Sequence, residues 1–388
     1  MKNTKKVLSM LLCLAMLLSM AACGETAKSE ASASAPAAVT ASVAESAAPE
    51  APAPEASEAS EGSAEEASEA EPSAVSVADE TPAVEYPITV TDQAGREVTI
   101  AQEPQKLVSG YYISTSALIA LGLQDKLVGI EAKADKRPIY SLSAPELIDL
   151  PNVGTAKEFD LEGCTALEPD LVILPMKLKD AAATLEELGI NVLLVNPEDQ
   201  PQLEDMISLI AEATNTQAQA EKLLKFMDDQ ETMLTEKLAD ADTPSVYLAG
   251  NSALLSTAGD AMYQADMIRL AGGVNAASEI ADTYWAEISY EQLLAWNPDY
   301  IILASDAEYT VEDVLADENL ADCTAVKNGN VYQLPSKAEA WDSPVPSGIL
   351  GAVWLANVLH PDVISEADCN ALYDNYYETF YGFRYSEN

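Results

Sequence analysis

Beyond residue 85, apolar positions recur along the chain with two different periods. Residues 88–92 and 96–100 alternate apolar and polar side chains around a Gln-Ala-Gly turn, which predicts a β-hairpin. Short continuous apolar runs predict buried strands at 106–109, 127–130, 170–174, 191–195, 245–249, 254–256, 300–304 and 331–334. Stretches with helical spacing separate them, at 114–121, 179–188, 262–270, 290–295, 310–315, 348–359 and 371–380. This alternation predicts an α/β fold with mostly parallel sheets.

A helical stretch from residue 202 to about 239 divides this series in two. It contains neither Pro nor Gly, so we expect one uninterrupted helix. A unit of short helix, Pro-Asp turn and apolar strand occurs on each side of it, at 160–174 and 289–303. We therefore predict two Rossmann-like lobes, 86–200 and 243–388, joined by a single long helix within 201–242. The ligand cleft is expected between the lobes.

The first 85 residues have a different character. Three lysines precede an apolar run over 7–22, which is typical of a secretory signal peptide spanning 1–22. The small residues before Cys23 resemble the lipobox of bacterial lipoproteins, which implies a lipid on Cys23 and attachment to the outer face of the cell membrane. An ordinary secretory signal is the alternative. Residues 23–85, rich in Ala, Ser, Glu and Pro, predict a disordered spacer or, alternatively, a partner-binding tail.

The composition and the motifs of the chain disfavour several classes of function. A net charge of −44 disfavours nucleic-acid binding. Residues 86–200 carry 9 bases against 18 acids, whereas 201–388 carry 7 against 32, so the first lobe is the better place for an anionic ligand. The single His, at position 360, gives no support for a His-rich metal site or a Ser-His-Asp triad. GxSxG, HExxH and P-loop motifs are absent from the sequence, so we expect no enzyme. Cys323 and Cys369 could pair or stay free.

Several segments together resemble the iron-siderophore/vitamin B12 family of ABC-transporter substrate-binding proteins. They are 88–98, 120–129, 152–154 and the two Pro-Asp-strand units, and the resemblance covers 86–383. It implies the class III fold, in which one helix joins the lobes. It also implies a monomer that delivers its ligand to an ABC permease dimer and its ATPase. Glu162 and Glu291 match the family's permease-docking glutamates; stabilisation of a helix N-terminus by a carboxylate is the alternative.

The resemblance also implies ligand contacts in loops that follow the strands. The candidate ligand-binding residues are Tyr111, Tyr112, Ser114, Thr115, Arg137, Met176, Lys177, Asn251, Trp285 and Trp341. Their aromatic and basic side chains suit an anionic iron or cobalt chelate, such as a ferric siderophore, a corrinoid or haem. Another small ligand, such as an oxyanion or a different metal chelate, is the alternative, as is a sensory or adhesion lipoprotein of the same fold. We expect no bound cofactor other than the lipid on Cys23.

Overall fold

The computed structural model describes residues 85–281 and 283–388. The expected signal peptide, Cys23 and nearly all of the spacer therefore lie outside the described residues. Within these ranges, no helix combines the length and apolar character that crossing a membrane requires.

The first lobe is built on a four-stranded parallel sheet with the strand order β4-β3-β5-β6. Its strands are β3 (Leu107–Ser109), β4 (Leu127–Gly129), β5 (Leu171–Pro175) and β6 (Asn191–Val195), and the hairpin β1 (Ile88–Thr91) and β2 (Glu97–Ile100) precedes them. Its helices are α1 (Tyr112–Ala120), α2 (Pro138–Ser143), α3 (Leu161–Ala166) and α4 (Lys179–Glu187). Every residue of β5 is buried, as expected for a parallel strand covered on both faces.

The second lobe holds a six-stranded mixed sheet. Its strands are β7 (Ser245–Ala249), β8 (Ser256–Ala258), β9 (Val274–Asn275), β10 (Trp285–Glu287), β11 (Tyr300–Leu303) and β12 (Val331–Gln333). The strands β9, β7, β11 and β12 run parallel, whereas β8 and β10 form an antiparallel edge. The helices are α7 (Tyr263–Leu270), α8 (Tyr290–Trp296), α9 (Val311–Leu315), α10 (Thr324–Asn328), α11 (Ile349–Leu359) and α12 (Glu366–Tyr381). Two α/β lobes confirm the predicted fold class.

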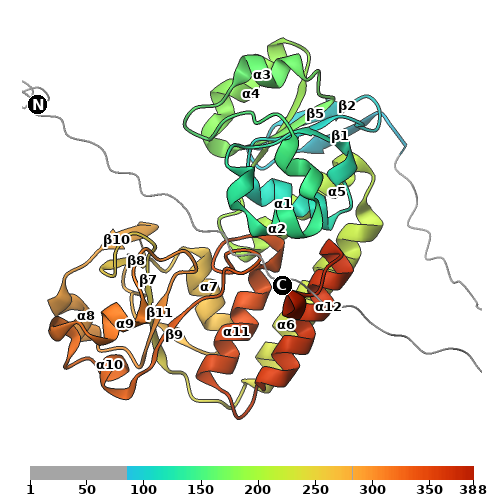
Figure 1. The fold of residues 1–388 in the computed structure, drawn as a ribbon. Helices are drawn as coiled ribbons and strands as arrows, with labels where there is room; N and C mark the ends of the chain where they lie inside the picture. Colours follow the sequence, from blue (N-terminus) through green and yellow to red (C-terminus); the bar gives the residue numbers. More distant parts are fainter. Residues whose placement is uncertain (1–84, 282) are drawn as a thin grey trace, which may run out of the picture. The chain divides into compact units, whose positions relative to one another are not determined.

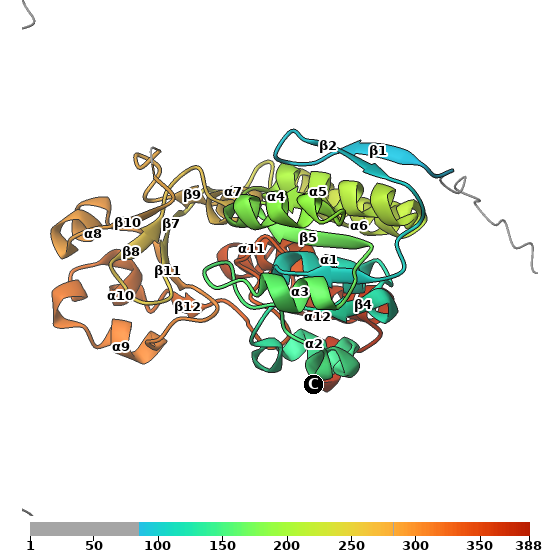
Figure 2. The same cartoon turned by 90° about the horizontal axis from the view of Figure 1, so that it is seen from above.

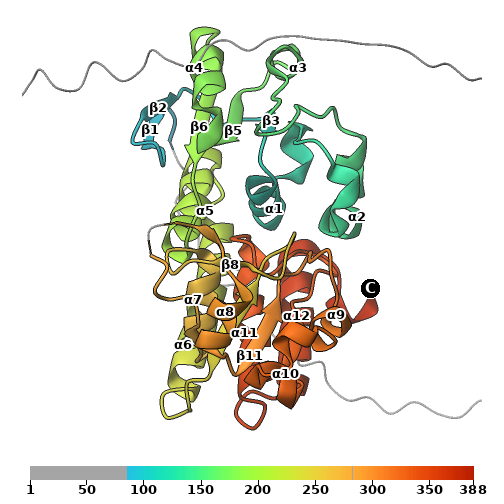
Figure 3. The same ribbon diagram turned by 90° about the vertical axis from the view of Figure 1, so that its left-hand side faces the viewer.

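The segment between the two sheets differs from the expectation of one uninterrupted helix. It forms two helices, α5 (Gln200–Thr214) and α6 (Gln217–Lys237), that follow one another from the first lobe into the second (Figure 3). Asn215 adopts the left-handed conformation with φ +60°, which ends α5 because asparagine tolerates this region better than most residues. The N–H of Thr216 then donates to the Ala211 carbonyl oxygen at 3.0 Å. The break needs neither Pro nor Gly, so those signals could not predict it.

The C-terminal helix α12 connects the lobes a second time. It packs beside α11 and reaches α1 of the first lobe, where the hydroxyl groups of Tyr381 and Ser116 lie 2.9 Å apart (Figure 1). Seen from above, the hairpin β1–β2 lies along α5 (Figure 2). The largest apolar core is continuous from α1 through α6 to α11 and α12. The two lobes therefore share one core on the side of the connecting helices.

All three described cysteines are free and buried, so the disulfide that the sequence left open does not form. Cys323 belongs to the apolar core beside the second-lobe sheet, whereas Cys369 lies in the large core shared by the lobes. Cys164 lies in the core of the first lobe.

Candidate functional site: a charged cavity between the lobes

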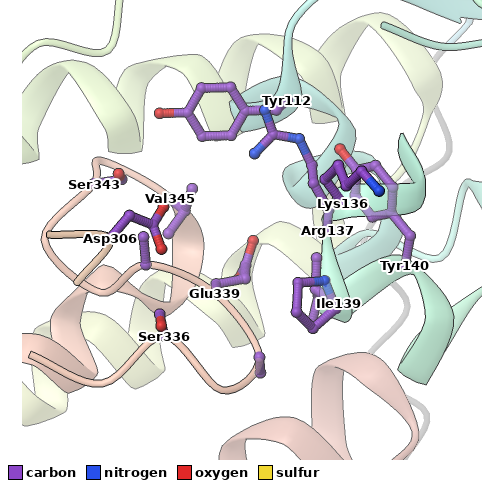
Figure 4. A pocket seen from close by; sticks show the side chains of 13 residues that line it. Tyr112, Lys136, Arg137, Ile139, Tyr140, Asp306, Ser336, Glu339, Ser343 and Val345 are labelled. Atoms are coloured by element: carbon purple, nitrogen blue, oxygen red, sulfur yellow. The ribbon is translucent and has the colours of Figure 1, made fainter. Parts of the chain in front are cut away.

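A cavity of about 70 Å³ lies where the first lobe faces the loops of the second. Figure 4 shows the side chains that line it. The first lobe contributes Tyr112, at the start of α1, and residues 136–140, at the start of α2. The second lobe contributes Asp306, which follows β11, and residues from the segment 336–345. A single buried water needs about 10–15 Å³ of such space, so the cavity accommodates a ligand of only a few heavy atoms.

The start of α1 owes its position to a close approach of the backbone to β5. A Cβ added at Gly110 would lie 2.6 Å from the Leu174 side chain, so any other residue between β3 and α1 would force Leu174 to shift. Tyr112 therefore enters the helix directly after the sheet edge, and its ring reaches the cavity. Burial raises the pKa of Tyr112, so its phenol stays protonated and can donate a hydrogen bond.

Arg137 is the main cation of the cavity. Pro138 opens α2 and disfavours helical backbone at the preceding residue, so Arg137 is extended at the helix entrance. Its guanidinium carbon lies 4.0 Å from the centre of the Tyr112 ring, in a cation–π contact. Its Nε lies 3.3 Å from Glu131 Oε1 but lacks the alignment of a hydrogen bond. The stacked ring fixes the plane of the guanidinium, whose fork of N–H groups suits a planar or tetrahedral oxyanion.

Glu131 fixes Arg137 from behind the cavity. This residue follows β4 closely and is only 5% exposed. Its Oε1 accepts a hydrogen bond from the Tyr140 hydroxyl at 2.6 Å, and its Oε2 accepts one from Thr115 Oγ1 at 2.7 Å. With both oxygens bonded, the carboxylate is a fixed counter-charge for Arg137 rather than a ligand contact.

The second lobe adds carboxyl groups to this region. Glu339 lines the cavity although it is only 8% exposed, and its Oε2 accepts a hydrogen bond from Ser347 Oγ at 2.6 Å. Asp342 lies nearby and accepts a hydrogen bond from the Ser305 N–H at 3.2 Å. Burial raises the pKa of both carboxyl groups. The cavity thus joins a first-lobe cation to acidic groups of the second lobe.

Of the ten ligand-binding residues predicted from the sequence, only Tyr112 and Arg137 line this cavity. Ser114 and Thr115 are fully buried, and their hydroxyls donate to the Tyr111 carbonyl at 2.8 Å and to Glu131 at 2.7 Å. Both donors are therefore used within the protein, and the Thr115 hydroxyl holds Glu131, the ion-pair partner of Arg137, in place. Tyr111 packs edge-on against Tyr112, with ring centres 5.3 Å apart.

The remaining candidates lie away from the cavity. Met176 packs on the first-lobe core, while Lys177 and Asn251 are exposed. Trp285 lies on the edge strand β10 and is 41% exposed. Its ring packs closely over the backbone of Gly250. Trp341 is fully buried, and its indole N–H donates to the Tyr377 hydroxyl at 2.8 Å. In this structure Trp341 therefore packs the core behind the cavity and has no surface for a ligand.

The two tryptophans should differ sharply in their effect on stability. Replacing Trp341 by Ala should lower the free energy of unfolding by about 3–5 kcal/mol, because it opens a large cavity and removes the partner of Tyr377. The matched change Trp285→Ala should cost under about 0.5 kcal/mol, since this side chain is partly in solvent. Urea denaturation of both variants measures the difference. Equal losses would contradict the core assignment of Trp341.

The expected docking glutamates occupy matching places on the two lobes. Glu162 lies in the first turn of α3 and Glu291 in the first turn of α8, and both are exposed. Backbone hydrogen bonding at the helix start lowers the pKa of Glu291. Asp160 and Ser289, not the glutamates, cap the two helices through their side chains. The cap position is therefore occupied independently of either glutamate.

Sequence reasoning missed two acidic residues that shape the cavity. Glu131 comes two residues after the end of β4 at Gly129, and the loop that follows a parallel strand is a typical position for a functional side chain. Glu339 lies between Ala338 and Ala340, but Lys337 and Asp342 are close to it in the sequence, so no local pattern distinguishes this charge. Within residues 85–281 and 283–388, no cluster of three or more His, Cys, Asp or Glu side chains is arranged to hold a metal ion.

Comparison with known proteins places this architecture in a family. Residues 107–338 match the family model described as "Periplasmic binding protein". The molybdate-binding protein MolA of Haemophilus influenzae is 27% identical over 319 residues, which cover 75% of this chain and 90% of MolA. The solved structure of MolA bound to molybdate has a TM-score of 0.67 and 25% identity, covering 77% of this chain and 99% of that one.

Two further relatives carry different descriptions. An uncharacterised ABC-transporter substrate-binding lipoprotein of Bacillus subtilis, YvrC, is 27% identical, covering 72% of this chain and 88% of YvrC. A cobalamin-binding protein of Halobacterium salinarum is 23% identical, covering 74% of this chain and 78% of the relative. The matched region includes both sheets and most of the cavity lining. This chain belongs to the periplasmic binding protein family of ABC transporters.

Proposed function

We propose that this protein is an extracytoplasmic receptor that binds a small oxyanion between its lobes and delivers it to an ABC permease dimer and its ATPase. The observation that carries the proposal is the half-buried Arg137 guanidinium, stacked on Tyr112 and aimed into a cavity of about 70 Å³. Such a cavity has room for a tetrahedral anion. The resemblance to MolA, which binds molybdate, supports the same ligand class.

The proposal includes attachment to the membrane through a lipid on Cys23. The support is the sequence before this cysteine and the description of YvrC as a lipoprotein. A tether of this kind would keep the receptor beside its permease, and the residues after Cys23 would serve as the spacer.

A metal chelate is the second candidate ligand, as the sequence first indicated. The observation that favours it is the exposed aromatic pair on the second lobe, Tyr284 and Trp285, which are 51% and 41% exposed. Flat aromatic surfaces suit a ferric siderophore, a corrinoid or haem, and one relative is described as cobalamin-binding. A ligand of that size would need the lobes to separate well beyond the arrangement seen at Arg137.

Native mass spectrometry of protein purified from the cells that make it separates the two candidates. We expect a mass increase equal to one small oxyanion, lost when the protein is dialysed and regained on adding molybdate. A bound mass of corrinoid, haem or siderophore size would contradict the proposal and favour the metal chelate. The Arg137→Gln variant, purified in the same way, serves as the control and should carry no anion.

A further inference from the structure

The charges around the cavity do not suit an anion unless a proton is added. The Arg137 guanidinium is already paired with Glu131, whose Oε1 lies 3.3 Å from Nε. Glu339 is a second buried carboxyl group on the cavity wall. If both glutamates are ionised, the charges of Arg137, Glu131 and Glu339 sum to minus one, which would repel an oxyanion. Asp342, the other buried carboxyl group of this region, can only add negative charge. The exposed pair Lys136 and Asp306 adds one charge of each sign and leaves this balance unchanged.

Glu339 is placed to meet the ligand directly. Its side chain extends from the second-lobe loop toward the side of the cavity formed by Tyr112 and Arg137 (Figure 4). One carboxyl oxygen, Oε2, is bonded by Ser347 Oγ at 2.6 Å. An acceptor-only oxyanion facing an ionised carboxylate would place two acceptors together without a hydrogen between them. A hydrogen bond between the two groups therefore requires one proton.

We propose that Glu339 shares one proton with the bound anion, so that oxyanions without a hydrogen are captured together with a proton from solvent. This inference rests on the proposed function, because it concerns the anion held by Arg137. It makes Glu339 a specificity-determining residue. Anions that bring their own hydrogen-bond donor bind without proton uptake, whereas molybdate or sulfate binds only as Glu339 becomes protonated.

The surroundings of Glu339 agree with a neutral carboxyl group in the loaded site. The ionisable groups that face it are Arg137 and Tyr112 from the first lobe and Tyr376, Tyr377 and Tyr381 from α12. Among these groups only Arg137 carries a charge at neutral pH, since burial raises the pKa of all four tyrosines. Burial likewise raises the pKa of Glu339, against the hydrogen bonds of the Ser116 and Ser347 side chains and the attraction of Arg137.

Isothermal titration with molybdate tests the proposal. Measured in buffers with different ionisation enthalpies, the wild-type protein should take up close to one proton per molybdate at any pH where Glu339 is ionised in the free protein. Its affinity should fall about tenfold per pH unit once Glu339 is ionised in the free protein. The Glu339→Gln variant, whose amide supplies the donor permanently, should bind without proton uptake and with a flat pH profile. Glu308→Gln, a change at an exposed carboxylate that does not line the cavity, should retain the proton uptake of the wild type.

The outcomes distinguish this inference from the proposed function. Molybdate binding that depends on Arg137 but takes up no proton would overturn the role of Glu339 and leave the oxyanion receptor intact. Failure of molybdate to bind at any pH would contradict the oxyanion function and this inference together.

A second measurement uses the wild-type protein alone, because the Glu339→Gln substitution could disturb packing. At mildly alkaline pH it should bind hydrogenphosphate roughly tenfold to a hundredfold more tightly than sulfate, a dianion that lacks only the proton. Equal affinities would overturn the inference without any variant.

Discussion

Replacing Arg137 with Gln should weaken molybdate binding by at least about a hundredfold, because it removes the one half-buried cation of the described cavity wall. Glu131 would also lose its counter-charge, although its bonds to Tyr140 and Thr115 would keep it in place. The side chain of Gln can still lie on Tyr112, so the fold should persist. Isothermal titration of the wild type and the variant gives the ratio of dissociation constants.

Two controls show whether the charge or its geometry matters. Arg137→Lys keeps a positive charge but loses the planar fork that lies over Tyr112, so we expect a smaller loss of about tenfold. Lys136→Gln removes a neighbouring charge whose side chain is 76% exposed, and solvent screening should limit its effect to a few-fold change. An Arg137→Gln variant that binds molybdate like the wild type would refute the assignment of the cavity as the ligand site.

Most of the fold could be predicted because its signals are local. Strands that carry a continuous apolar run, such as β5 and β11, begin and end within about one residue of the predicted positions, whereas β8 lies two residues beyond the predicted 254–256. The short pieces β9 and β10 were missed because two or three residues do not establish a period. The break between α5 and α6 was missed because Asn215 ends a helix through its backbone conformation, in a stretch whose composition otherwise favours a helix.

The site was harder to predict than the fold, for a physical reason. Loop positions after strands identify where side chains gather, and Tyr112 and Arg137 were found in this way. Such loop positions do not show which of the gathered side chains point into the cavity. Trp341 and Asn251 were both predicted to lie in loops that face the cleft. Trp341 instead packs in the core against Tyr377, whereas Asn251 is exposed. Glu131 is held by Thr115, 16 residues away in the sequence, and Glu339 by Ser347, 8 residues away. Contacts between residues so far apart in the sequence depend on the fold and have no local pattern that predicts them.

Replacing Glu162 and Glu291 together with Ala should abolish uptake of the ligand into cells while leaving its affinity for the receptor unchanged. The two carboxylates occupy the same position in equivalent units, one in the first turn of α3 and the other in the first turn of α8. Figure 1 shows that these helices belong to different lobes. A pair of exposed charges fixed to two lobes can engage a two-fold symmetric permease at two points, provided that the permease offers basic pockets. Uptake of labelled ligand by cells, beside titration of the purified variant, measures the two effects separately.

The alternative role for these glutamates is stabilisation of a helix N-terminus, and it predicts a different result. Neither glutamate is needed as a cap, because the Asp160 and Ser289 side chains already accept hydrogen bonds from backbone N–H groups of α3 and α8. A charge near the helix start contributes about 0.3–1 kcal/mol at an exposed site. The double variant would then unfold at slightly lower urea concentration but support normal uptake. The matched control Glu312→Ala, at the exposed first turn of α9, removes such a charge from a helix outside the two repeated units and should leave uptake intact. Loss of uptake in the double variant alone, with unchanged affinity, would assign the two carboxylates to the permease, whereas retained uptake would rule that assignment out.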